Sequence, residues 1–267
     1  MEPWITVALC WLLFVGTHIG LATSRIRTPL VARLGRWGFA HLYSAVAALT
    51  FGLAIHALAV HQGEGPAGLS LNRFAGIRGL CIGLIGSGLT LSIASLWFAP
   101  ASALALLIDG SPREPRGLER ITRHPFFVGT ALLGVGHFLV ASRLVVAIGF
   151  AGIALLSIAG AMHQDAKLRA NLGRPYADYL AATSIVPFAA ILRGRGRLVW
   201  REIPWLGLAL GLFVTFALRA VHDSLLGHGG AWVIAFVVGG AVLATLQIRI
   251  YRKSDTRRGR ALDGIAS

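Results

Sequence analysis

The chain alternates between seven long apolar stretches and shorter connections that carry most of its polar residues. Each apolar stretch is close to the ~20 residues that a helix needs to cross the hydrocarbon core of a bilayer. The pattern therefore predicts an all-α, polytopic bundle of six or seven transmembrane helices in a single domain. The apolar stretches cover residues 3–22, 37–61, 77–99, 125–142, 144–163, 204–222 and 229–250.

Composition agrees with a membrane protein. The 267 residues are 55% hydrophobic and 13% charged, with a mean hydropathy of +0.70, whereas a soluble domain carries roughly a quarter charged residues. The first apolar stretch follows Glu2 rather than a basic segment, and it is longer than the apolar region of a secretory signal. We therefore expect it to be a retained first helix.

Lys and Arg are distributed unequally between alternate connections. Connections 23–36, 100–124 and 164–203, together with the C-terminal tail, hold 21 of the 25. The positive-inside rule then predicts an outer N-terminus and a cytoplasmic C-terminus in a bacterial-type inner membrane, with the basic loops against anionic lipid. The net charge of +14 thus reflects topology. Nucleic-acid binding is not expected, because no basic patch is interleaved with stacking aromatics.

Small residues and cysteines in the apolar stretches predict packing rather than chemistry. The 33 glycines are scattered through these stretches, for example in 79–88 and 237–241. Small residues let transmembrane helices approach closely, so a tightly packed bundle is expected. Cys10 and Cys81 lie inside two different stretches without metal-motif spacing, which predicts unpaired structural thiols.

Two connections contain structure of their own. Residues 101–119 have a short apolar run followed by a turn with Pro and Arg, which predicts an interfacial or re-entrant segment. Residues 163–197 begin as a polar helix that breaks at Gly173. The apolar part of that connection, within 177–192, is interrupted by Pro187 and is too short to span, which favours an interfacial position.

The junction "RITRHPFF" combines charge with a helix start. Pro125 suits the first turn of a helix, where its missing N–H has no partner to lose. Arg120 and Arg123 then mark the membrane boundary as interfacial anchors. The alternative is functional: Arg123 and His124 face a polar pocket shared with 168–179 and bind an anionic group, such as a haem propionate.

Five of the nine histidines lie within or at the ends of predicted spans, namely His18, His41, His56, His137 and His222. Ionisable groups inside membranes are functional candidates, and two facing imidazoles can hold a haem iron. The scarcity of Asp and Glu in the spans excludes a di-iron carboxylate site. The His-Glu-x-x-His and Gly-x-Ser-x-Gly motifs are absent from the sequence.

The chain resembles the NnrU family of integral membrane proteins. The segments that carry the resemblance are "GTHIGLATSRIRTPLVARLGRWGFAHLYS", "RITRHPFFVGTALLGVGHFLV" and "HQDAKLRANLGRPYADYLAATSIVPFAAILRGR". Residues 1–200 therefore form an NnrU-like membrane domain. Residues 201–267 add two generic spans and a basic tail to the same domain.

The resemblance implies two functions. Bacterial members are associated with denitrification and nitrogen-oxide metabolism. The related plant zeta-carotene isomerase uses haem b to isomerise a cis double bond in a polyene, which makes a lipophilic small molecule the expected partner here. Its haem ligands are histidines, and His18 and His137 match them. Arg123 and His124 are the further candidates for contact with the cofactor.

Helix geometry gives the expected depths of His18 and His137 in the bilayer. His137 lies roughly 20 Å along its helix from His124, at ~1.5 Å per residue, so it falls in the outer half of the bilayer. His18 lies in the inner half of the first span. The two axial ligands of one iron must lie within about 4 Å of each other along the bilayer normal. His56 and His222 are the alternative ligands in the outer half.

Two other classes of function stay open. Isoprenylcysteine-type methyltransferases also carry Arg-His-Pro before a membrane hairpin, here 125–163. A cytoplasmic segment then follows, here 168–187, which in those enzymes helps to bind S-adenosylmethionine. This chain lacks their acidic pair and has only His163 and Asp165 at that place. The third class is a non-enzymatic membrane assembly factor. No side chain is identified as a general acid or base.

Overall fold

The computed structural model describes residues 1–97 and 114–242 of the chain. Within these residues the fold is all helical, and the only β pairing is an isolated bridge between Ala67 and Arg143. The α-helices are α1 (Pro3–Ala22), α2 (Ser24–His61), α3 (Ala75–Trp97), α4 (Pro125–Val140), α5 (Leu144–Leu172), α6 (Arg174–Ala182), α7 (Ala189–Leu192) and α8 (Trp205–Ala220). Short 3-10 helices cover Leu71–Arg73, Gly117–Arg120, Trp200–Glu202, His222–Ser224 and His228–Gly230.

Four helices are long and apolar enough to cross a bilayer, which supports the predicted membrane bundle. They are Pro3–Ala22, Trp37–His61, Ala75–Leu96 and Leu144–Leu172, and the shorter apolar helices are Pro125–Val140, Trp205–Ala220 and His228–Val242. All seven predicted apolar stretches therefore correspond to helices over their described residues. The number of spans and the orientation stay predictions.

Local sequence explains where these helices bend and end. Gly35 has a φ of 71° and a ψ of 169°, which breaks α2 just before the predicted span at 37–61. Only glycine adopts that conformation without strain. Gly173, with a φ of 60°, separates α5 from α6, which confirms the predicted break in 163–197. The predicted segment at 101–119 lies largely outside the described residues.

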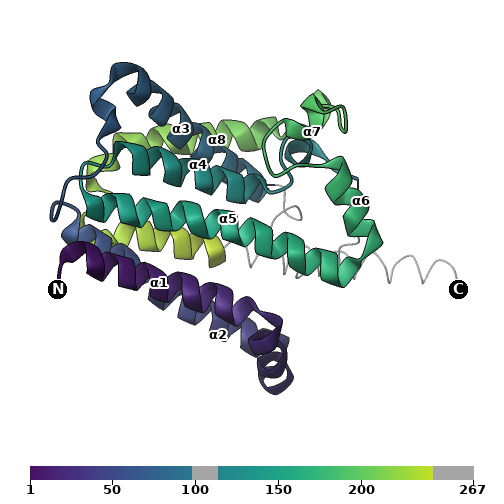
Figure 1. Cartoon of the computed structure of the whole chain (residues 1–267), viewed down its shortest axis with the longest axis horizontal. Helices are drawn as coiled ribbons and strands as arrows, with labels where there is room; N and C mark the ends of the chain where they lie inside the picture. The colour runs from purple at the N-terminus through teal and green to yellow at the C-terminus, as the bar shows by residue number, and fades with distance from the viewer. Residues whose placement is uncertain (98–113, 243–267) are drawn as a thin grey trace, which may run out of the picture.

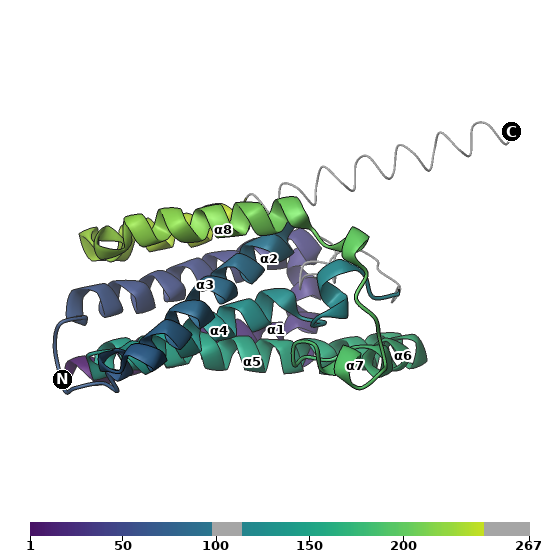
Figure 2. The same cartoon turned by 90° about the horizontal axis from the view of Figure 1, so that it is seen from above.

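The helices are arranged side by side with their axes roughly aligned (Figure 1). α1 and α2 form an antiparallel hairpin, α5 packs against α1 and α4, and α3 lies between α4 and α8 (Figure 2). A cluster that includes Val7, Trp11, Phe14, Leu58 and Val145 forms the core between α1, α2 and α5. This connectivity places α6 and α7 at one end of the bundle, which we call the α6–α7 end. The turns after α2, α4 and α8 lie at the opposite end.

Close glycine contacts confirm the expected tight packing between α3 and α4. A Cβ added to Gly129 would lie 2.5 Å from the Ser92 hydroxyl and 2.6 Å from the Gly88 carbonyl oxygen. The two backbones can approach this closely because neither glycine carries a side chain. Gly79 and Gly83 have nothing within 4 Å of such a Cβ, so packing does not account for them. Cys10 and Cys81 are free thiols, as expected.

Candidate functional site

Asp165, near the end of α5, is the centre of a buried polar cluster. Its Oδ2 accepts hydrogen bonds from Nε and an Nη of Arg123 at 2.9 and 2.7 Å. Its Oδ1 accepts from Nε2 of His124 and from the hydroxyl of Tyr176, both at 2.7 Å. Three side chains from two segments, the chain before α4 and helix α6, thus converge on one carboxylate, and we call this group the Asp165 cluster.

Backbone contacts hold the Arg-His-Pro segment in place. The backbone N–H of Arg123 donates to the Ser184 carbonyl at 2.9 Å, and the N–H of Phe188 donates to the Ile121 carbonyl at 2.8 Å. The Thr122 hydroxyl, which is fully buried, donates to the Ile185 carbonyl at 2.6 Å. The segment before α4 is therefore paired with the chain between α6 and α7. Pro125 then begins α4 as predicted.

Burial and charge determine what the Asp165 cluster can do. The side chains of His124, Asp165 and Arg123 are only 5%, 13% and 15% exposed. Burial, and then the hydrogen bond to Asp165, raises the pKa of the Tyr176 phenol, so Tyr176 stays protonated and acts as a donor. All four donors point at one carboxylate, which stabilises its charge. The arrangement is a clamp between α4, α5 and α6 rather than a proton-transfer site.

The anion that Arg123 and His124 bind in this structure is therefore the chain's own Asp165. In the functional alternative, both residues face a pocket shared with 168–179, and Tyr176 from that segment does join them at Asp165. The interfacial-anchor interpretation of Arg120 and Arg123 did not anticipate the ion pairs that both residues form.

A second ion pair joins the same end of the bundle to α8. Arg120 donates from Nε and an Nη to the two carboxylate oxygens of Glu202 at 2.7 and 3.1 Å. The backbone N–H of Gly117 donates to Glu202 at 3.1 Å. The hydrogen bonds from Arg120 and Gly117 lower the pKa of Glu202 to about 2. Glu202 is half-buried and lies just before α8.

His18, the first expected haem ligand, lies inside the α1–α2 hairpin. Its ring centroid is 5.0 Å from that of Tyr43 and 5.3 Å from that of Phe14. The Tyr43 hydroxyl donates to the backbone carbonyl of His18 at 3.2 Å. The buried Nδ1 of His18 has no hydrogen-bond partner in the described part of the chain.

His137, the second expected ligand, lies near the opposite end of the bundle. Its Nδ1 is 3.0 Å from the Leu133 carbonyl oxygen, which assigns the Nδ1 proton to that bond and leaves Nε2 as the nitrogen that can bind a metal. The ring stacks on Phe150 with centroids 4.1 Å apart. The ring of His222, just after α8, is parallel to it within 8°, with centroids 6.2 Å apart.

The structure does not bring His18 and His137 together. The Trp11 ring packs directly against Gly152 of the parallel helix α5, and His18 lies two turns beyond Trp11. His137 instead stacks on Phe150, slightly before Gly152. The two histidines are thus separated by roughly 13 Å along the bundle, at 1.5 Å per residue. Ligands of one metal ion lie only about 4 Å apart, at ~2 Å per bond.

Of the two alternative outer-half ligands, His222 is the neighbour of His137. His56 lies beside Gly229, with its Nδ1 3.2 Å from that residue's carbonyl oxygen. Among the described residues, no group of three or more His, Cys, Asp or Glu side chains is arranged to hold a metal ion. Of the expected ligands, His137 and His222 are therefore the two whose rings are neighbours in the described part of the chain.

Sequence reasoning missed the roles of Asp165, Tyr176 and Glu202. In the sequence, Asp165 is prominent only because it stands where methyltransferases of the isoprenylcysteine type carry an acidic pair. One signal was present, since the chain has 11 acidic residues against 25 basic ones. An acidic residue at the end of an apolar helix therefore has many potential arginine partners, although the sequence does not say which one it binds.

Comparison with known proteins places the chain in a family. It is 27% identical over 201 residues to the chloroplastic 15-cis-zeta-carotene isomerase of Arabidopsis thaliana, which covers 73% of this chain and 52% of that protein. It is 31% identical over 113 residues to the chloroplastic 15-cis-zeta-carotene isomerase of Zea mays, covering 40% of this chain and 31% of that protein. The chain thus spans about half or less of these relatives' length. No solved structure matches. A family model described as "NnrU protein" matches residues 6–229, and the chain belongs to the NnrU family.

Proposed function

We propose that this protein is a membrane isomerase that acts on a double bond of a lipophilic polyene and binds haem. The observation that carries the proposal is the similarity to the 15-cis-zeta-carotene isomerases, which extends over 73% of the chain. A bundle with four helices apolar enough to cross a bilayer suits such a substrate, because a polyene dissolves in the same hydrocarbon phase.

In this proposal His137 and His222, rather than His137 and His18, would hold the haem iron. The rings of these two histidines are neighbours, with centroids 6.2 Å apart and planes parallel within 8°. Phe150 supports the His137 ring from one face, which restricts its rotation.

The haem would supply the iron chemistry, and the chain would supply binding and orientation. His137 is oriented by the contact of its Nδ1 with the Leu133 carbonyl, which leaves Nε2 as the ligand nitrogen. The Asp165 cluster lies at the other end of the bundle and fixes the ends of α4 and α5, the helices that carry His137 and Phe150.

Spectroscopy of the purified protein tests the cofactor first. We expect a Soret band with sharp reduced α and β bands after haem addition. His137→Ala and His222→Ala should both lose these bands, and His18→Ala should keep them. His61→Ala is the matched control, because His61 bonds only to the neighbouring Glu64. Loss of the bands in His18→Ala with retention in His222→Ala would contradict the pair.

The activity is tested separately with a cis-polyene in liposomes. The haem-loaded protein should shift the cis/trans ratio, measured by chromatography, and the His137→Ala variant should not. A colourless protein that still isomerises the polyene would exclude haem but keep the isomerase. A haem protein without isomerisation would exclude the substrate class. Binding of S-adenosylmethionine instead would favour the methyltransferase alternative.

A further inference from the structure

A hollow of about 340 Å³ at the α6–α7 end has a mainly basic lining. It lies between the chain before the 3-10 helix Gly117–Arg120 and the turn after α7. Its charged lining residues are Arg120, Arg195, Arg197 and Glu114.

Two of the three arginines in this hollow keep donors for a ligand. Arg120 is bound to both oxygens of Glu202 and is neutralised by it. Arg195 donates one N–H to the Ala181 carbonyl at 3.0 Å, and its other guanidinium N–H groups make no hydrogen bond with the described residues. Arg197 makes no hydrogen bond or ion pair within the described part of the chain. Glu114 offsets one of these charges, so the lining stays net positive. Guanidinium groups match the oxygens of a phosphate.

Exposed apolar and aromatic side chains flank the hollow and indicate where its ligand comes from. Val186, Phe188 and Leu192, around α7, are all exposed. Trp200 and Trp205 are exposed as well and stack with their ring centroids 6.0 Å apart. Tryptophan is enriched at the level of the lipid headgroups. Arginines beside such residues meet the phosphates of the same lipid layer.

We infer that the hollow binds the phosphate of an anionic phospholipid headgroup of the phosphatidylglycerol type. Arg195 and Arg197 contact the phosphate, and the exposed residues around α7 contact the start of the acyl chains. The Arg120–Glu202 pair fixes the wall of the site. This inference uses neither the haem nor the polyene and stands independently of the proposed function.

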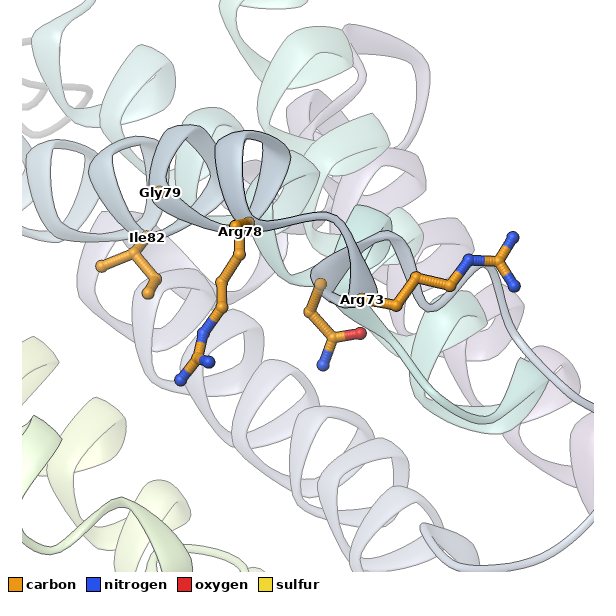
Figure 3. A pocket seen from close by; sticks show the side chains of 6 residues that line it. Arg73, Arg78, Gly79 and Ile82 are labelled. Carbon is orange, nitrogen blue, oxygen red and sulfur yellow. The ribbon is translucent and has the colours of Figure 1, made fainter.

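A second hollow at the opposite end of the bundle provides a matched control (Figure 3). It has about 420 Å³ and is also lined by two arginines, Arg73 and Arg78. In Figure 3, Arg73 extends away from Arg78, and its guanidinium lies 5.0 Å from the Phe74 ring centroid. The two guanidinium groups therefore do not converge on one ligand. Mutating both arginines removes the same charge as the Arg195 and Arg197 double variant, which makes this hollow a control.

The experiment titrates the full chain in a neutral detergent with short-chain phosphatidylglycerol, with short-chain phosphatidylcholine and with inorganic phosphate, using native mass spectrometry. Arg195→Gln combined with Arg197→Gln should weaken phosphatidylglycerol binding roughly tenfold. Arg73→Gln combined with Arg78→Gln should change it less than about twofold. Glu114→Gln should strengthen binding, which a loss of folding cannot imitate.

Each result supports or overturns the inference. Preferential phosphatidylglycerol binding that depends on Arg195 and Arg197 supports it. Equal binding of phosphatidylglycerol and phosphatidylcholine overturns it, as does an equal loss in the Arg73 and Arg78 control. If inorganic phosphate displaces the lipid at an equal concentration, the hollow is a site for free phosphate, and the proposal of a lipid headgroup is overturned.

Discussion

The two ends of the helix bundle treat their ionisable groups in different ways. At the α6–α7 end, Asp165 and Glu202 are paired with Arg123 and Arg120 through two or more hydrogen bonds each. At the opposite end, His137 and His222 face each other as parallel rings. His137 there contacts a backbone carbonyl and Phe150, and no carboxylate holds it.

The difference separates groups that hold the fold from groups that can take a ligand. A largely buried carboxylate that accepts four hydrogen bonds has no lone pair left to accept a hydrogen bond from a ligand. Its removal would leave the donors around it without an acceptor. An imidazole whose Nε2 makes no bond within the described residues can bind a metal. We therefore attribute a role in stability to the Asp165 cluster, whereas ligand binding by His137 and His222 belongs to the proposed function.

The largest predicted effect is the loss of the Asp165 carboxylate. Asp165→Ala should destabilise the protein by about 3–5 kcal/mol, because the buried His124 and the largely buried Arg123 would be left without an anion. The measurement is unfolding in detergent micelles, followed by circular dichroism. A loss below about 1 kcal/mol would mean that the cluster is not a structural clamp.

Removing one donor from the same cluster should cost less. Tyr176→Phe deletes the hydroxyl that donates to Asp165 at 2.7 Å and keeps the buried ring. The expected loss is about 1–2 kcal/mol, as for one hydrogen bond to a charged group. Unchanged stability in Tyr176→Phe would contradict the assignment of this hydroxyl to Asp165.

Acid should weaken the Arg120–Glu202 pair. The pKa of Glu202 is lowered to about 2 from its usual 4.5 by its bonds to Arg120 and Gly117. Its stabilising contribution is therefore complete above pH 4.5 and is lost as pH falls toward 2. We expect the stability difference between the wild type and Glu202→Gln, below about 1 kcal/mol at neutral pH, to vanish in acid. A difference that is constant with pH would refute this explanation.

The smallest stability effect is predicted at the histidine end. His222→Ala should change the unfolding free energy by less than about 0.5 kcal/mol, because the side chain is half exposed and its polar contact among the described residues is a long one, 3.5 Å to Asp223. The same variant should also lack the haem absorption bands after haem addition. Destabilisation comparable to Asp165→Ala would place His222 among the structural groups and remove the contrast between the two ends.

Much of the fold could be predicted from the sequence because hydrophobic length is a local property. The first apolar stretch, 3–22, is helix α1 residue for residue, and Pro125 begins α4 as expected. The break at Gly173 followed from glycine's backbone freedom. The predicted span at 144–163 and the polar helix expected after it form one continuous helix, α5, which ends at Leu172. Its polar last turns stay helical because they pack on α6 and carry Asp165.

The candidate site was less predictable. The sequence drew attention to Arg123, His124 and His137, which are respectively an ion-pair partner, a buried hydrogen-bond donor and one member of the histidine pair. Asp165 lies 41 residues from His124 along the chain. No local pattern connects the two, because their contact depends on how α4 and α5 align.

By itself, the sequence determined an apolar helical membrane bundle, the positions of its main breaks and a family membership that extends over most of its length. These depend on the composition and order of neighbouring residues. Only the tertiary structure decided that Asp165 binds Arg123, His124 and Tyr176 and that His137 is next to His222 rather than His18. The reason is physical: helix packing sets the axial level of each side chain, and two residues can share a ligand only when those levels coincide.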